Sequence, residues 1–204
     1  CIVTADALHC QKNIAKEIKE TDAEYVLALK GNQGTAFAEV KSFLDDAVQR
    51  KETHLVYTET VGKEHGRLEV RRYWQSEKLE WFADRHEWAG LKSVGVVEAR
   101  RTVKGKESVE RRYYLSSLSA DVTKFARAVR GHWGVENGLH WVLDVVFGED
   151  QARARSGHAL ENLAATRRMA VNLLRRDKTC QRSIKGKLLR AAIDPDYLKR
   201  VLTN

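Results

Sequence analysis

The sequence predicts an α/β fold in which a strand–helix–strand unit is followed by a β-rich segment and a helical carboxy-terminal part. Short apolar runs typical of buried strands, at residues 1–7 and 25–30, flank a stretch with helical spacing. From about residue 53 apolar and polar residues alternate, which favours strands, and after Leu118 helical spacing returns. We therefore divide the 204 residues into 1–52, 53–118 and 119–204.

The first part contains two strands and two helices. Between the strands, the spacing of Ile14, Ala15 and Ile18 predicts a helix from about Gln11 to Glu20. The glycines in residues 31–34 break the pattern, and a second helix is expected to run to about Arg50. Strands joined through a helix pair in parallel, so this part predicts a parallel α/β core.

The β-rich part contains a clear hairpin signal. Residues 94–103 and 108–116 are rich in strand-forming residues and bracket Lys104-Gly105-Lys106, which predicts an antiparallel pair.

The last part is expected to be helical. Ser119 or Asp121 is a suitable N-cap for a first helix, and Pro195 is suited to the start of the last one. In that last helix, Tyr197, Leu198, Val201 and Leu202 are expected to cover the core. Between the first and the last of these helices we expect further helices at residues 135–147, 163–174 and 184–192, with a polar loop at 148–157.

The positive charge is concentrated at the carboxy-terminal end. The chain has a net charge of +8, and residues 151–204 carry 13 Lys and Arg against 4 Asp and Glu. A surface of this kind suits a phosphate backbone, although a solvated set of helices would have the same composition.

Composition excludes several classes of protein. There is no apolar run near 18 residues and no signal segment, so neither a membrane protein nor a secreted one is supported, and a cytoplasmic location is expected. The three cysteines lack the spacing of a zinc site and are odd in number, which favours reduced structural thiols.

Two strand ends carry candidate functional residues. Asp6 follows the first strand, at the edge where α/β sheets present ligand-binding groups, but it is equally suited to cap the helical segment near Ala7. Lys30, Asn32 and Gln33 follow the next strand at the same edge. An ammonium and two amides can contact phosphate, and a plain polar turn is the alternative.

Glu136 is the third candidate. It lies among glycines at 131, 134 and 138, which are costly inside a helix and suggest that a ligand approaches the backbone. On a helix, Glu136, His140 and Asp144 would share one stripe and form a structural metal site. The simpler alternative is that Trp133 and Trp141 pack in the core while Glu136 forms an ion pair.

Three motifs together resemble a known family. They are Thr4-Ala5-Asp6-Ala7-Leu8-His9-Cys10-Gln11, Leu29-Lys30-Gly31-Asn32-Gln33 and the segment from His132 to Val145. In this order they closely resemble the bacterial insertion-sequence DDE transposases, within the group that contains the H-repeat-associated proteins. The resemblance covers essentially the whole chain.

The resemblance implies a partial RNase H-like core with a β-rich insertion between its second and third acids. In this family three carboxylates bind two divalent ions, Mg²⁺ or Mn²⁺, for DNA strand cleavage and transfer. By resemblance Asp6 is the second acid and Glu136 the third, and both bind metal. Transposon ends and target DNA are the implied partners. The expected DNA contacts are Lys30, Asn32, Gln33, Arg130, His132, Arg153 and Arg155.

Two features depart from the family pattern. The family's first aspartate belongs to an earlier strand, for which there is no room before Asp6, so we expect a fragment, a product of proteolysis or a decayed gene that is inactive alone. Core surface exposed in this way would favour a homodimer. Val129, His132 and Leu143 stand at the family's Tyr, Arg and Lys positions around the third acid, so those roles do not transfer. The alternative function is a catalytically inactive DNA-binding or interaction remnant.

Overall fold

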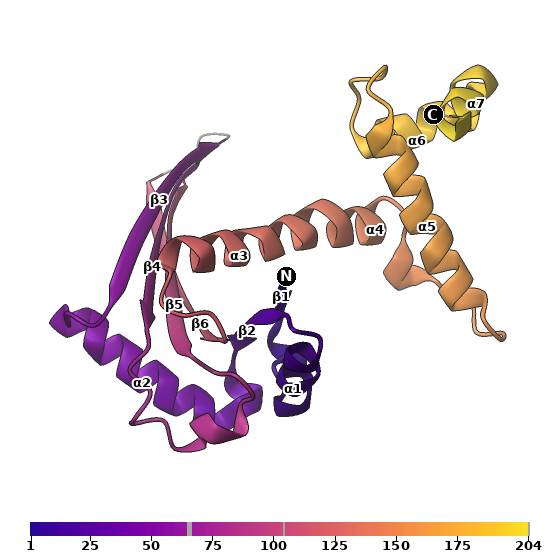
Figure 1. Ribbon diagram of the computed structural model, residues 1–204. Helices are drawn as coiled ribbons and strands as arrows, with labels where there is room; N and C mark the ends of the chain where they lie inside the picture. The colour runs from indigo at the N-terminus through magenta and orange to yellow at the C-terminus, as the bar shows by residue number, and fades with distance from the viewer. Residues whose placement is uncertain (65–66, 104, 204) are drawn as a thin grey trace. The chain divides into compact units, whose positions relative to one another are not determined.

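The computed structural model describes residues 1–64, 67–103 and 105–203, and the side chains of residues 63, 64, 67, 68, 136 and 137 lie outside that description. The chain forms two compact units, Cys1–His132 and Trp133–Asn204. Figure 1 labels the helices and strands of both units.

The first unit is built on one sheet. Its described strands have the order β1-β2-β6-β5-β4-β3. β1 (Ile2–Ala5) and β2 (Glu24–Leu29) are parallel, which confirms the prediction for the first part of the chain. The other neighbours are antiparallel: β3 (Val56–Glu64), β4 (Arg67–Ser76), β5 (Ser93–Val103) and β6 (Lys106–Ser116). Because β6 pairs with β2, the β-rich segment continues the sheet that β1 and β2 begin.

The expected hairpin is present. β5 and β6 pair along their whole length, from Ser93 with Ser116 to Val103 with Lys106. The result is a mixed α/β unit with a mostly antiparallel sheet.

Helices cover both faces of this sheet (Figure 1). α1 (Lys12–Glu20) and α2 (Gly34–Arg50) pack on one face, and α3 (Val122–Val135) packs on the other. Successive residues of a strand point to opposite faces, and β2 shows the consequence. Its side chains at 25, 27 and 29 belong to the core on the α1 and α2 side, whereas Val26 belongs to the core under α3.

Close packing of α3 depends on a glycine in β5. A Cβ atom added to Gly95 would lie 2.6 Å from Cζ of Phe125, which is fully buried between Tyr73 and Tyr114 in edge-to-face contacts. Any larger side chain at this position would therefore push α3 away from the sheet.

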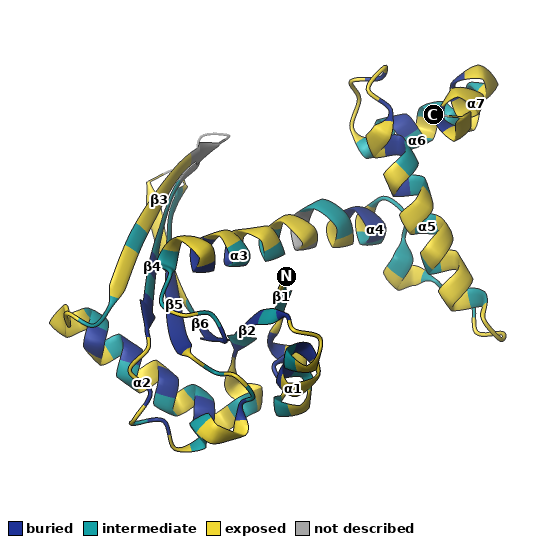
Figure 2. Ribbon diagram, viewed as in Figure 1, coloured by how far each residue is buried: buried dark blue, intermediate teal, exposed yellow. Residues whose placement is uncertain are grey.

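The second unit is helical, with most of its residues exposed (Figure 2). The chain enters it within α3 and continues through a π-helical turn (Glu136–His140) and α4 (Trp141–Val145). A 3-10 turn (Glu149–Gln151) lies in the expected polar loop, and three helices follow: α5 (Ala159–Arg176), α6 (Ile184–Ile193) and α7 (Pro195–Thr203).

Two small apolar clusters hold the second unit together. One joins Val142 and Leu143 of α4 to Val171 of α5, and the other joins Leu174, Cys180 and two residues of α7. Of the residues expected to cover the core in the last helix, Tyr197 and Val201 are buried, but Leu198 and Leu202 are exposed. The prediction was wrong for these two because α7 is only nine residues long and contacts its neighbours along one narrow stripe.

Trp141 also differs from expectation. Its side chain is 55% exposed, so it does not pack in the core. Among the described helices none is both long and apolar enough to cross a membrane. The three cysteines are free thiols, as expected.

A buried polar cluster connects the three last helices. Asp177, directly after α5, accepts hydrogen bonds from the Thr179 hydroxyl (2.6 Å) and the Tyr197 hydroxyl (2.8 Å). The buried Lys187 ammonium of α6 donates to the backbone carbonyls of Leu174 (2.9 Å) and Asp177 (2.5 Å). The hydrogen bonds from Thr179 and Tyr197 hold the pKa of the Asp177 carboxyl far below its usual value.

We expect Gly95→Ala to lower the free energy of unfolding of the first unit by about 1–3 kcal/mol, the usual cost of overpacking a core. Urea denaturation followed by far-UV circular dichroism measures it. Gly62→Ala is the matched control, because the nearest atom to its added Cβ would be 4.0 Å away. An equal loss in the two variants would contradict the role given to Gly95.

We expect Asp177→Asn to lower the melting temperature of the helical unit at pH 7, because the amide cannot accept all the hydrogen bonds that the carboxylate accepts. A lowered folded-state pKa stabilises above the unfolded-state pKa, about 3.9, and the contribution is lost as pH falls through the folded-state value. The difference between wild type and variant should therefore persist at pH 4 and shrink only in stronger acid. Equal melting temperatures at pH 7 would show that the cluster does not stabilise the unit.

Candidate functional site

Asp6 lies directly after β1, at the carboxyl end of the parallel strand pair. It is the N-cap of a 3-10 turn (Ala7–His9), and its Oδ1 accepts a hydrogen bond from the His9 backbone N–H at 3.3 Å. The same oxygen lies 2.8 Å from His9 Nδ1. The side chain is 52% exposed, so the capping role predicted as an alternative is present and still leaves the carboxylate accessible.

The surroundings of Asp6 keep it ionised. Its partial burial would raise the pKa of the carboxyl, but the hydrogen bonds from the His9 ring and backbone outweigh that effect. The pKa is therefore lowered, and at neutral pH the group is an anion that can bind a cation.

The candidate residues after β2 lie at the same edge of the sheet. Lys30 is exposed at the start of a 3-10 turn (Gly31–Gln33). The Asn32 amide donates to the Ala7 carbonyl at 2.5 Å, and the Gln33 amide donates to the Cys10 carbonyl at 2.9 Å. These amide groups therefore support the backbone of the loop that follows Asp6.

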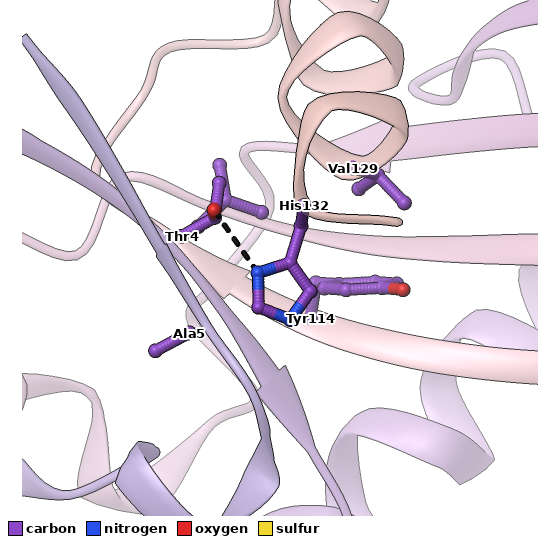
Figure 3. Close-up of a pocket in the computed structure, with 6 residues that line it drawn as sticks. Thr4, Ala5, Tyr114, Val129 and His132 are labelled. Atoms are coloured by element: carbon purple, nitrogen blue, oxygen red, sulfur yellow. Dashed lines mark hydrogen bonds between the residues drawn. The ribbon is translucent and has the colours of Figure 1, made fainter. Parts of the chain in front are cut away.

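His132 of α3 connects that helix to β1. Its Nδ1 lies 3.2 Å from the Thr4 hydroxyl (Figure 3). The two residues line a small pocket between α3 and the sheet, together with Ala5, Val26, Tyr114 and Val129. His132 was expected to contact DNA, and in the structure its half-buried ring holds α3 beside the strand that precedes Asp6. Arg130, two residues earlier in α3, is exposed.

Glu136 begins the π-helical turn that interrupts the expected helix. The predicted stripe of Glu136, His140 and Asp144 assumed α-helical spacing, which this π turn interrupts, and the stripe stays a prediction. Among the residues that the structure describes there is no group of three or more metal-binding side chains. The Glu136 side chain lies outside that description.

The remaining predicted residues belong to the loop before α5. Arg153 and Arg155 are both exposed there, in the second unit. The structure thus brings Asp6, Lys30, Asn32 and Gln33 to one edge of the sheet and leaves this pair on a separate unit.

Sequence reasoning missed Arg175. Its guanidinium Nη2, in the last turn of α5, donates a hydrogen bond to the Gly138 carbonyl within the π-helical turn. The two residues are 37 positions apart, and no local pattern could have paired them.

Comparison with known proteins bears on this geometry. A family model described as "Transposase DDE domain" matches residues 1–173, most of the chain and both candidate acids. The chain belongs to this family. The transposase chain continues beyond the matched region through the end of α5 and through α6 and α7.

Curated relatives have consistent names. The chain is 39% identical over 210 residues to "Putative transposase YncI" of Escherichia coli O157:H7, covering 100% of this chain and 53% of that protein. It is 38% identical over 209 residues to "H repeat-associated putative transposase YhhI" of Escherichia coli K12, covering 98% and 54% respectively. The chain therefore spans about half the length of these relatives. The resemblance to the group of H-repeat-associated proteins is confirmed.

We expect His9→Ala to raise the pKa of Asp6, because it removes the ring hydrogen bond and charge that lower it. Carbon-detected NMR titration of the Asp6 carboxyl measures the change. The stability that His9 contributes through Asp6 should be present above about pH 4 and disappear as pH falls through the lowered pKa. Leu8→Ala, at a neighbouring exposed position, should leave the titration unchanged. An unaltered Asp6 pKa in His9→Ala would contradict the assignment.

Proposed function

We propose that this chain supplies Asp6 and Glu136 as two of the three metal-binding carboxylates of a DDE transposase catalytic domain, which cleaves and joins DNA strands. Membership of the family is the observation that carries the proposal. The position of Asp6 supports it, because the carboxyl end of parallel strands is where α/β sheets present functional groups.

The donor chemistry of Asp6 fits a divalent cation. Mg²⁺ and Mn²⁺ prefer oxygen ligands, and Asp6 is an exposed carboxylate with a lowered pKa. When bound, a metal pair supplies charge stabilisation to the scissile phosphate and activates the attacking oxygen. Glu136 is proposed as the second ligand from this chain, on the strength of its position in the family motif.

A contact within the first unit supports the position of Asp6. The hydrogen bond between Thr4 and His132 holds α3 against β1 two residues before Asp6.

We further propose that the first unit is part of an RNase H-like core, with residues 53–118 as its insertion. β1 is an edge strand of the described sheet, paired with β2 on one side. Its other side can accept a further strand, and the family pattern assigns the first aspartate to such a strand. In the proposed enzyme Lys30, Arg130, Arg153 and Arg155 contact DNA phosphates.

A second candidate function is a DNA-binding remnant without catalysis. The observation that favours it is the capping role of Asp6, which explains an aspartate at this position without any metal. Because the two candidates share DNA binding, only metal binding and strand cleavage distinguish them.

We expect Mn²⁺ to bind the purified chain and to bind at least about tenfold more weakly to Asp6→Ala and Glu136→Ala, since loss of even a residue that only supports a ligand costs that much. Titration followed by electron paramagnetic resonance measures free Mn²⁺. Glu17→Ala, which removes an exposed acid from α1, is the control and should bind like wild type.

The same proteins are then incubated with linear duplex DNA carrying the transposon ends. We expect only weak metal-dependent nicking by the chain alone, since one carboxylate is supplied from elsewhere, and none by the two variants. Mn²⁺ binding that neither substitution weakens would rule out the proposed site and favour the remnant.

A further inference from the structure

A shallow, positively charged pocket lies at the carboxy-terminal end of α5, in the second unit. It is lined by Asn172, Arg175, Arg176 and Lys178. Arg175, Arg176 and Lys178 follow the last residue matched by the family model, so the match does not cover them. All four side chains are exposed, and three of them are cations within four consecutive positions.

Two cations of this pocket, Arg175 and Lys178, are oriented by neutral groups. Arg175 donates to the Gly138 carbonyl, and Lys178 donates to the Arg175 carbonyl at 3.1 Å. Within the described part of the chain, neither of these two side chains forms a salt bridge, although salt bridges are frequent on the first unit. Their positive charge is therefore held in a fixed geometry without being neutralised by a carboxylate.

Helix capping alone does not account for this arrangement. Cations near the last turn of a helix do interact favourably with its carbonyl end. In this pocket, however, an amide and further cations stand around a common hollow, and the Arg175 guanidinium donates to a carbonyl outside its own helix, that of Gly138. Arg and Asn side chains together provide the donors that phosphate oxygens accept, and an Arg guanidinium can bind phosphate with two parallel hydrogen bonds.

We infer that this pocket binds phosphates of the DNA backbone, as a subsite whose three cations lie outside the matched family region. The inference takes its ligand from the proposed function, and charge complementarity supports it, because residues 151–204 carry 13 Lys and Arg against 4 Asp and Glu.

The hydrogen bond from Arg175 gives the subsite a second property. The side chain that lines the pocket also contacts the Gly138 carbonyl, two residues after Glu136 in the π-helical turn. A π turn leaves backbone carbonyls outside the regular helical pattern, and Arg175 satisfies one of them. Arg175 therefore acts as a positioning residue that couples the phosphate subsite to the turn that carries the third acid.

The test compares two double variants of the full chain in duplex DNA binding. Arg175→Gln with Lys178→Gln removes two charges from the pocket, and Lys185→Gln with Lys199→Gln removes two exposed charges from α6 and α7 of the same unit. Affinity is measured by fluorescence anisotropy across a range of salt concentrations. Removal of one cation that binds a phosphate should reduce the slope of log affinity against log salt by about one.

We expect the pocket variant to reduce that slope by about two on every duplex sequence, and the control variant to leave it nearly unchanged. Equal reductions in both would show that the tail binds DNA through diffuse charge and would overturn the pocket. Circular dichroism verifies that both variants are folded.

A gain of binding provides evidence that misfolding cannot imitate. Asn172→Lys adds a cation to the rim of the pocket on an exposed face of α5, where Lys is a good helix former. It should steepen the slope by about one, and an unchanged slope would count against the subsite. RNA duplex of the same length is the competitor, and preference for RNA would overturn the assignment to DNA.

Failure of this inference and failure of the proposed function give different results. Asp6→Ala should leave the salt slope intact, because the acid is not part of the pocket. If neither Asp6→Ala nor Glu136→Ala weakens Mn²⁺ binding but the pocket variant still reduces the slope more than the control variant, the catalytic proposal is removed and the subsite is retained. Metal-dependent cleavage by the wild-type chain, with equal slopes in the two double variants, would do the reverse.

Discussion

Burial of β2 on both of its faces is the constraint on which the first unit depends. Tyr25, Leu27 and Leu29 pack toward α1 and α2, and Val26 packs under α3. A shift of one residue would move each of these side chains to the other face, so the pairing of β2 with β1 and β6 has one acceptable register. That register also aligns the carboxyl ends of β1 and β2, and so places the residues that follow these two strands. The position of Asp6 and Lys30 at the same edge of the sheet is thus a consequence of apolar packing elsewhere in the sheet.

The sequence was most informative where structure depends on neighbouring residues. The spacing of apolar residues predicted α1, the two strands around it and the β5–β6 hairpin within one or two residues. Pro195 correctly marked the start of α7. Prediction from the sequence failed where burial of a side chain depends on what lies beside its helix. Leu198 and Leu202 have helical spacing but no neighbouring surface to cover, and Trp141 is exposed. The π-helical turn has no local signature of this kind.

The candidate site was predictable in its residue types and less so in its contacts. Strand-end position identified Asp6 as a candidate, and the family motif is the source of the roles proposed for Asp6 and Glu136. The contacts that hold the site connect distant residues: Thr4 with His132, Asn32 with Ala7, and Arg175 with Gly138. Each joins elements whose proximity is set by packing of the whole unit, so no motif could contain it. His132 shows the difference, because a residue expected to contact DNA is also a structural connection.

The π-helical turn has an evolutionary consequence. Such turns arise when one residue is added to an α-helix, and the extra residue rotates everything that follows by about 100° around the helix axis. In this chain Val142 and Leu143 face the Val171 cluster after that rotation. A deletion of one residue between Glu136 and His140 would restore a regular helix and turn that apolar surface toward water. The spacing between Glu136 and α4 is therefore fixed by length as well as by residue identity, and homologous sequences should tolerate substitutions in this turn more readily than insertions or deletions.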